Sequence, residues 1–229
     1  MIVEQLLRST GPYAILDIDS LEARGLDVAP AAQAMLGGGA SLLQLRAKGR
    51  SARKILAWLE ALVPLAKEAG VPLFVNDRAD LAAVAGAPGV HVGQDDLPVT
   101  EVRRLFPELR VGVSTHSLAQ LEAALAERPD YVAFGPIFPT RSKAQPDPVV
   151  GLELLARAAT LATAAGVPLV AIGGIDSRNA HQVRATGAVP AVIAALLPEL
   201  AADTPEPALA VIYARTRALC AGGDGSSPA

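Results

Sequence analysis

Short apolar runs alternate with longer amphipathic stretches along most of this 229-residue chain, and this alternation limits the possible folds more than any other feature. The short runs resemble strands buried on both faces, whereas apolar residues in the longer stretches recur every three or four positions, as in surface helices. Strands separated by helices pair in parallel, because each helix carries the chain back over the sheet. The expected strands are Tyr13–Asp17, Ser41–Leu45, Leu73–Asn76, Gly89–Val92, Arg110–Ser114, Tyr131–Phe134, Leu169–Ile172 and Ala191–Ala194.

The stretches between the strands predict helices, and eight strand–helix units favour a single (β/α)8 TIM barrel. A doubly wound open sheet is the alternative, but no Gly-x-Gly-x-x-Gly motif follows the first strand, and the Gly37–Gly39 run fits a helix stop. We expect one barrel domain over residues 1–220 and a disordered Gly/Ser-rich tail over 221–229. The clearest predicted helices are Ser51–Ala69, Pro98–Phe106, Ser117–Glu127 and Gly151–Ala165.

Composition and charge exclude several classes of protein. A net charge of −3 argues against a general nucleic-acid surface. The single cysteine, Cys220, cannot form an internal disulfide and fits a reducing compartment. No apolar run reaches the roughly 18 residues needed to span a bilayer, and the N-terminus lacks the pattern of a signal peptide. The expectation is a cytoplasmic protein with no membrane partner.

The loop Gly135–Lys143 directly follows the expected sixth strand, and two prolines and a glycine end that strand. Its last four residues supply two hydroxyl groups and two cations: Thr140, Arg141, Ser142 and Lys143. Such groups can donate several hydrogen bonds to phosphate oxygens, partly assisted by charge. A solvated basic turn is the simpler explanation, so the loop alone leaves both alternatives open.

Polar residues also follow the other expected strands, at the barrel rim where active sites lie. Gln44, Arg46 and Lys48 occupy alternate positions, so an extended chain directs all three to the same side. The remaining polar ends are Asn76-Asp77, the segment from His91 to Asp96, Ser114-Thr115-His116 and Gly173-Gly174-Ile175.

Each group also has a structural explanation. Arg46 and Lys48 could be solvated charges, and Asp77 could cap the next helix. Asp95 and Asp96 could be acids at the start of the helix from Pro98, where the helix dipole favours negative charge. These separate explanations do not account for the gathering of cations and acids on one rim. Carboxylates among cations at a phosphate site indicate Mg²⁺, with Asp77 and either Asp95 or Asp96 as ligands. The residues alone therefore predict two anionic groups, one near strands two to four and the other near strands six to eight.

Two histidines near the rim are assigned structural roles. His91 lies within a strand pattern and is expected to be a hydrogen-bonded core residue. His116 has no adjacent acid, so positioning or packing is favoured over a role as a base. His181 is expected to be exposed on an outer helix.

Taken together, the motifs resemble the thiamine phosphate synthase family, in the order and spacing of that family. The resemblance extends from about Tyr13 to Arg217. It is carried by Gln44-Leu-Arg-Ala-Lys48, Asn76-Asp77-Arg-Ala-Asp-Leu81, Gly89 to Pro98, Gly112-Val-Ser-Thr-His116, Gly135 to Lys143 and Ala171-Ile-Gly-Gly-Ile175.

The resemblance implies a (β/α)8 transferase that joins a hydroxymethylpyrimidine pyrophosphate to a thiazole phosphate, forming thiamine phosphate and pyrophosphate. It assigns Mg²⁺ to Asp77 and Asp96 and the thiazole substrate to Thr140 and Ser142. The phosphate of that substrate would contact Gly174 and the backbone of Ile193 and Ala194. The pyrimidine pyrophosphate would be held by Gln44, Arg46, Lys48, Asn76, Ser114 and Lys143, among which Arg46, Lys48 and Lys143 would stabilise the leaving group.

The eighth-strand region departs from the family pattern. Residues 187–196 are one residue short, and Ala194 stands where a serine is common, which removes a hydrogen bond of about 1 kcal/mol. A related thiazole tautomerase and a noncatalytic barrel that senses a phosphate ligand are the alternatives. The tautomerase relatives generally lack the full Gln-x-Arg-x-Lys and Asp/Asp set. The expected partners are small-molecule substrates, and the sequence leaves open whether the chain forms a homo-oligomer.

Overall fold

A computed structural model of the chain describes residues 10–140, 148–199 and 207–220. Its eight strands form a closed barrel in which every neighbouring pair is parallel and the spatial order follows the sequence. The predicted (β/α)8 barrel is therefore confirmed. The predicted tail over 221–229 lies outside the described residues. The strands are β1 (Tyr13–Asp17), β2 (Leu42–Arg46), β3 (Leu73–Asn76), β4 (Gly89–Val92), β5 (Arg110–Thr115), β6 (Tyr131–Phe134), β7 (Leu169–Ile172) and β8 (Val189–Val192).

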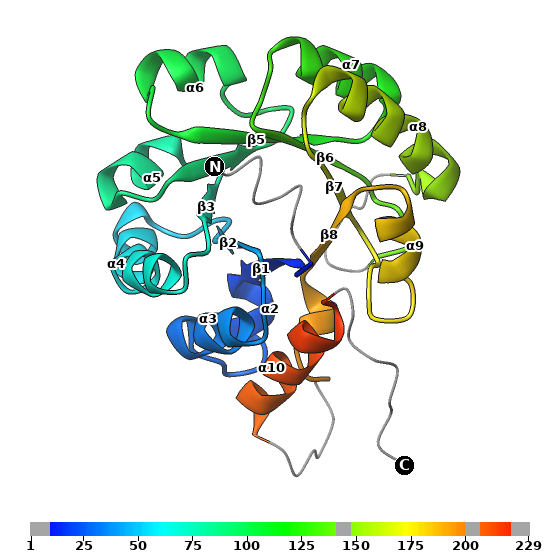
Figure 1. Cartoon of the computed structure of the whole chain (residues 1–229). Helices are drawn as coiled ribbons and strands as arrows, with labels where there is room; N and C mark the ends of the chain where they lie inside the picture. The colour runs from blue at the N-terminus through cyan, green and yellow to red at the C-terminus, as the bar shows by residue number, and fades with distance from the viewer. Residues whose placement is uncertain (1–9, 141–147, 200–206, 221–229) are drawn as a thin grey trace.

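The helices form a ring around the outside of the barrel (Figure 1). Local sequence sets their ends: Ser117 caps one helix by accepting a hydrogen bond from the backbone N–H of Gln120. Gly38 ends another, as the Gly37–Gly39 run predicted. Among the described residues they are α2 (Ile18–Glu22), α3 (Val28–Gly37), α4 (Ala52–Glu68), α5 (Ala79–Ala85), α6 (Val99–Leu105), α7 (Leu118–Ala126), α8 (Gly151–Ala165), α9 (Ala180–Ala185), the 3₁₀ helix η1 (Ala194–Leu196) and α10 (Ala208–Ala218).

The predicted position of the last strand is wrong by two residues. The expected strand Ala191–Ala194 lies instead at Val189–Val192, and Pro190 is inside it, opposite Ala171. The strand tolerates this proline because its pairing with β1 starts only at Ala191, after the residue that lacks an N–H. As a consequence, Ile193 and Ala194 lie beyond the strand, at the start of η1.

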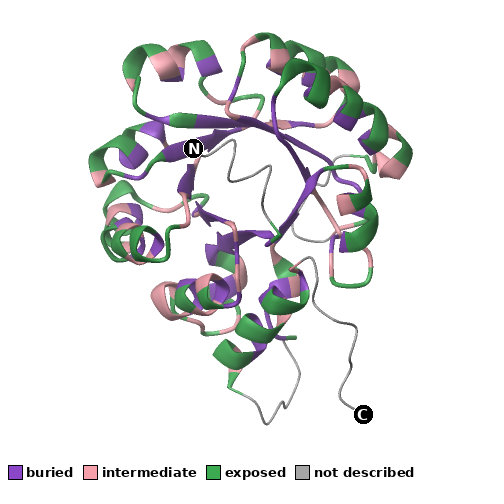
Figure 2. Ribbon diagram, in the orientation of Figure 1, coloured by how far each residue is buried: buried purple, intermediate pink, exposed green. Residues whose placement is uncertain are grey.

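The apolar residues form two cores, and the strands are buried between them (Figure 2). The larger core lies between the strands and the helices. The smaller core fills the barrel itself and includes Tyr13, Phe74 and Tyr131. Two glycines make room for these rings. A Cβ at Gly89 would lie 2.5 Å from the Phe74 ring, and one at Gly112 would lie 2.0 Å from Tyr131 Cζ.

Candidate active site

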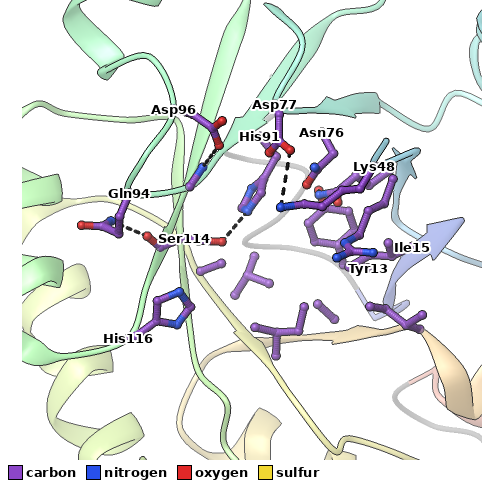
Figure 3. A pocket seen from close by; sticks show the side chains of 18 of the residues that line it. Tyr13, Ile15, Lys48, Asn76, Asp77, His91, Gln94, Asp96, Ser114 and His116 are labelled. Atoms are coloured by element: carbon purple, nitrogen blue, oxygen red, sulfur yellow. Dashed lines mark hydrogen bonds and ion pairs between the residues drawn. The ribbon is translucent and has the colours of Figure 1, made fainter. Parts of the chain in front are cut away.

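A cavity of about 500 Å³ opens at the carboxyl ends of the strands (Figure 3). Most of its polar side chains come from β2 to β5 and the segments that directly follow these strands, and most of its apolar ones come from β1 and β6 to β8. The predicted concentration of polarity on one rim is therefore confirmed. The lining residues are Tyr13, Ile15, Gln44, Arg46, Lys48, Asn76, Asp77, His91, Gly93, Gln94, Asp95, Asp96, Ser114, His116, Gln120, Ala133, Val170, Ile172, Ala191 and Ile193.

The structure brings most of the predicted site residues together and leaves some apart. Three described residues, Thr140, Gly174 and Ala194, do not line the cavity. Arg141, Ser142 and Lys143 lie outside the described residues, so their roles stay predictions. The predicted residues that line the cavity are Gln44, Arg46, Lys48, Asn76, Asp77, Asp96, Ser114 and Ile193.

Two carboxyl groups and one ammonium group lie close together beside β3 and β4. Lys48 Nζ is 3.6 Å from Asp77 Oδ2, and Asp96 Oδ2 accepts a hydrogen bond of 2.7 Å from the backbone N–H of Gly93. Burial raises the pKa of Asp77, the Lys48 charge lowers it, and the Asp96 charge raises it further, so that it lies above its ordinary value of 3.8. The two carboxylates therefore repel each other.

The backbone at Asp77 adopts a left-handed conformation, with φ of 64°. Asp and Asn tolerate this region better than other non-glycine residues. The carboxylate of Asp77 does not cap α5, because the residue at the cap position is Arg78 and it has no side-chain cap bond. The capping alternative is therefore wrong. An unfavourable backbone conformation at a cavity-lining acid is typical of a functional position.

Arg46 is held by an acid that the sequence analysis did not select. Its guanidinium forms an ion pair with Asp17, at the end of β1, whose side chain is 4% exposed. Asp17 also accepts hydrogen bonds from the backbone N–H and the hydroxyl of Ser20, at 3.0 and 2.6 Å. With these partners, Asp17 fixes one terminal nitrogen of Arg46 while the side chain lines the cavity. A polar residue at the carboxyl end of the first strand was the available signal.

His91 and His116 both bond to protein groups at the cavity, as their predicted structural roles require. His91 Nε2 lies 2.8 Å from Ser114 Oγ, and Gln94 Nε2 donates to the Ser114 carbonyl at 2.6 Å (Figure 3). His116 Nδ1 lies 2.7 Å from the carbonyl oxygen of Gly135. His116 thus ties β5 to the loop after β6. His181 is exposed on α9, as predicted.

The start of the loop Gly135–Lys143 is fixed against the end of β7. Ile137 N–H donates to the Ile172 carbonyl at 2.9 Å, and Phe138 N–H donates to the Gly173 carbonyl at 3.0 Å. A Cβ at Gly174 would lie 2.4 Å from the carbonyl oxygen of Pro139. Gly173 and Gly174 therefore allow the two backbones to approach closely, a role that the sequence analysis did not assign to them.

Fold and site together define a barrel enzyme whose cations, amides and acids meet at the carboxyl ends of the strands, where barrel enzymes carry their active sites. A family model described as thiamine monophosphate synthase matches residues 13–196. The chain belongs to this family and is a transferase of thiamine biosynthesis.

Individual relatives agree with the family assignment. The chain is 48% identical over 184 residues to a thiamine-phosphate synthase of Anaeromyxobacter dehalogenans, which covers 78% of this chain and 81% of the relative. It is 43% identical over 211 residues to one of Roseiflexus castenholzii, which covers 91% of this chain and 86% of the relative.

Solved structures both inside and outside this family share the fold. Thiamine phosphate pyrophosphorylase from Pyrococcus furiosus superposes with a TM-score of 0.77 at 29% identity, covering 93% of this chain and 95% of that one. A 2-keto-3-deoxy-6-phospho-gluconate aldolase from Zymomonas mobilis superposes with a TM-score of 0.64 at 19% identity, over 96% of both chains. The second likeness shows the fold alone. In the described part of the chain, no helix has the length and apolar character to cross a membrane.

Proposed function

We propose that this chain joins a hydroxymethylpyrimidine pyrophosphate to a thiazole phosphate, forming thiamine phosphate and releasing pyrophosphate. The observation that carries the proposal is the meeting of Arg46, Lys48, Asn76, Asp77 and Asp96 at one end of the cavity, in a chain that belongs to the thiamine monophosphate synthase family. A pyrophosphate needs several donors and cations within one site, and this cluster supplies them.

The chain's own residues suit a reaction in which the leaving group departs first. The C–O bond to pyrophosphate breaks and its electron pair leaves with the anion, while the electron-rich aminopyrimidine bears the cation. The lone pair of the thiazole nitrogen then forms the new C–N bond. Arg46 and Lys48 stabilise the charge that grows on the pyrophosphate, and Lys143 is predicted to join them. The reaction needs no protein nucleophile.

The opposite wall of the cavity suits the pyrimidine ring. Ile15, Ala133, Val170 and Ile172 give this wall an apolar surface against which a flat ring can pack. Gln44 adds a polar group at its edge. Holding both substrates in one orientation supplies the remaining catalysis, because a bound pair reacts without the entropy cost of an encounter.

We propose Mg²⁺ as the cofactor, held by Asp77 and Asp96. The two carboxylates adjoin closely enough for the Asp96 charge to raise the pKa of Asp77, and a divalent cation would relieve that repulsion. Among the described residues, no group of three or more His, Cys, Asp or Glu side chains could hold a metal. Two carboxylates completed by phosphate oxygens and water are a common Mg²⁺ arrangement. When bound, the ion would neutralise charge on the pyrophosphate.

The thiazole phosphate is assigned to the segment after β8, beside the apolar wall proposed for the pyrimidine ring. Ile193 lines the cavity there, and Ala194 begins η1, whose first backbone N–H groups are suitable phosphate donors. Thr140, Ser142 and Gly174 are proposed to complete this part of the site. The family resemblance is the support for these three residues.

Incubation of the purified protein with both substrates and Mg²⁺ tests the proposal, with thiamine phosphate and pyrophosphate as the expected products. Asp77→Ala and Lys143→Ala should abolish turnover. Asp96→Asn and Asp95→Asn form a matched pair, because both acids line the cavity but only Asp96 is assigned to the metal. Asp96→Asn should remove most activity, whereas Asp95→Asn should retain most of it.

Two other outcomes would replace the proposal. Isomerisation of the thiazole without formation of thiamine phosphate would assign the chain to the tautomerases. Binding of the substrates without turnover would favour a barrel that senses a phosphate ligand, as the shortened eighth-strand region first suggested.

A further inference from the structure

A chain of hydrogen bonds crosses the barrel interior below the cavity and ends at Ser114. Gln44 Nε2 donates to the Tyr13 hydroxyl at 2.6 Å, and the Tyr13 and Tyr131 hydroxyls are 2.8 Å apart. The Tyr131 hydroxyl lies 2.7 Å from His91 Nδ1, and His91 Nε2 lies 2.8 Å from Ser114 Oγ. These five residues come from five different strands, so only the closed barrel brings them together.

Proton counting gives this chain of bonds a direction. Burial raises the pKa of both phenols, so each is neutral and has one proton to donate. The Tyr13 hydroxyl accepts a hydrogen bond from Gln44 and donates its own proton in a hydrogen bond to the Tyr131 oxygen. Tyr131 in turn donates to His91 Nδ1, which must be the unprotonated nitrogen. His91 therefore carries its proton on Nε2 and donates it to Ser114.

The opposite direction leaves a buried donor without an acceptor. If His91 donated from Nδ1 to Tyr131, then Tyr131 would donate to Tyr13. The Tyr13 oxygen would accept two hydrogen bonds, and its own proton would have no acceptor among these five residues. An unsatisfied buried donor is destabilising, because it loses its hydrogen bonds to water and gains none in the protein. Within the described residues, no buried side-chain nitrogen or oxygen lacks a partner. The direction from Gln44 to Ser114 is the one in which both phenol protons and the imidazole proton have an acceptor among these five residues.

The packing around Tyr131 holds its hydroxyl in place. Its ring meets the rings of Tyr13 and Phe74 edge to face, with centroids 5.8 and 5.3 Å away, and is stacked on His91 at 5.5 Å. The absence of a side chain at Gly112 provides the space for the phenol end of the ring. The oxygen therefore has little freedom to exchange partners.

We propose that Tyr13 and Tyr131 are positioning residues that fix His91 as its Nε2–H tautomer and so leave the Ser114 hydroxyl proton for donation into the cavity. Ser114 is then a hydrogen-bond donor to an acceptor on the ligand. The identity of that acceptor, an oxygen of the pyrophosphate, rests on the proposed function. The tautomer of His91 does not depend on it.

The first test is the protonation of the His91 ring in ligand-free protein labelled with ¹⁵N-histidine. Nitrogen chemical shifts separate protonated from unprotonated ring nitrogens, and His91→Gln identifies the His91 signals. We expect a neutral ring with the proton on Nε2. A proton on Nδ1, or on both nitrogens near pH 7.5, would overturn the inference.

Gln44→Glu provides a matched reversal of direction, because a carboxylate of the same shape can accept from Tyr13 but cannot donate to it. The proton on His91 should move to Nδ1 in this variant. An unchanged tautomer would contradict the proposed direction of the hydrogen bonds from Gln44 to Ser114. Tyr131→Phe, which keeps the ring and removes the oxygen, gives a second check, since His91 should then show both tautomers.

The second test measures the binding of inorganic pyrophosphate with Mg²⁺ by calorimetry. Ser114→Ala should weaken binding by about 10-fold, the loss of one hydrogen bond to a charged group. Tyr131→Phe should weaken it by about 3-fold in the wild-type background and should have no further effect in Ser114→Ala. Equal effects of Tyr131→Phe in both backgrounds would assign the tyrosine to packing alone. If pyrophosphate does not bind at all, the proposed function fails. The tautomer experiment still decides whether Tyr13 and Tyr131 set the tautomer of His91.

Discussion

Gly112 on β5 allows a direct test of the barrel interior. A Cβ at this position would lie 2.0 Å from Tyr131 Cζ, 2.3 Å from Cε1 and 2.4 Å from the hydroxyl oxygen. Because carbon atoms pack at about 3.5–4.0 Å, Gly112→Ala requires the Tyr131 ring to move by roughly 1.5 Å. The ring is fully buried against Tyr13, Phe74 and His91, so neighbouring rings must move with it.

The expected loss of stability follows from these contacts. Overpacking a core costs typically 1–3 kcal/mol, and a ring fixed on several sides belongs in the upper part of that range. Alanine in a strand is otherwise better than glycine by roughly 0.5–1 kcal/mol, which offsets part of the cost. We expect Gly112→Ala to lower the free energy of unfolding by about 2 kcal/mol, or Tm by about 4–8 °C for a chain of this size.

Urea denaturation of Gly112→Ala, Gly25→Ala and the wild type measures the effect. Gly25 is the control, because its Cβ would meet nothing within 4 Å and only its left-handed φ of 63° opposes alanine. Combining Gly112→Ala with Tyr131→Leu should recover part of the loss, since the shorter side chain vacates the contested space. A neutral or stabilising Gly112→Ala would refute this account of the barrel interior.

Three further predictions concern the charged groups of the site. Because burial and Asp96 raise the pKa of Asp77, Asp77→Asn should raise Tm at pH 7 while lowering turnover by about 100-fold or more. This gain in Tm should be complete above the raised pKa of Asp77. It should vanish as the pH falls below the ordinary value of 3.8, where Asp77 is protonated in both the folded and the unfolded wild type. Thermal unfolding at a series of pH values measures it. Arg46→Ala should lower the free energy of unfolding by about 3 kcal/mol in urea denaturation, because it leaves Asp17 buried without its cation. Asp17→Asn should cause a smaller loss of stability and should instead lower kcat/KM. Mg²⁺ and pyrophosphate together should raise Tm more than the sum of their separate effects, and EDTA should abolish this excess, because two carboxylates alone hold Mg²⁺ weakly.

Seven of the eight strands could be located from the sequence because turn residues or polar residues bound each apolar run. The eighth strand was placed two residues too late, at Ala191–Ala194 instead of Val189–Val192. Pro190 caused this error, because a proline is expected at the start of a strand or before it. The apolar run continues past the strand into η1, so its composition does not mark where the strand ends.

The rim of the site was predictable for a different reason. In a parallel barrel every strand ends at the same rim, so polar residues at strand ends must gather there, as Arg46, Lys48 and Asp77 do. Tyr13 and Tyr131 were not identified, because an aromatic residue inside an apolar strand has the same pattern whether its hydroxyl is used or not. The two hydroxyls meet across 118 residues of sequence, a contact that no local pattern encodes.

The buried polar groups of this barrel are explained better by orientation than by stability. An apolar pair of similar volume in place of Asp17 and Arg46 would often be as stable, because burying two charges costs about as much as their attraction returns. The phenols of Tyr13 and Tyr131 likewise add little net stability over phenylalanines. What both sets provide is direction, because Asp17 fixes the guanidinium of Arg46 and the phenols fix the proton of His91. A cavity that holds a pyrophosphate, as proposed, needs donors already aimed at it, and the satisfied hydrogen bonds of the described interior supply such orientation.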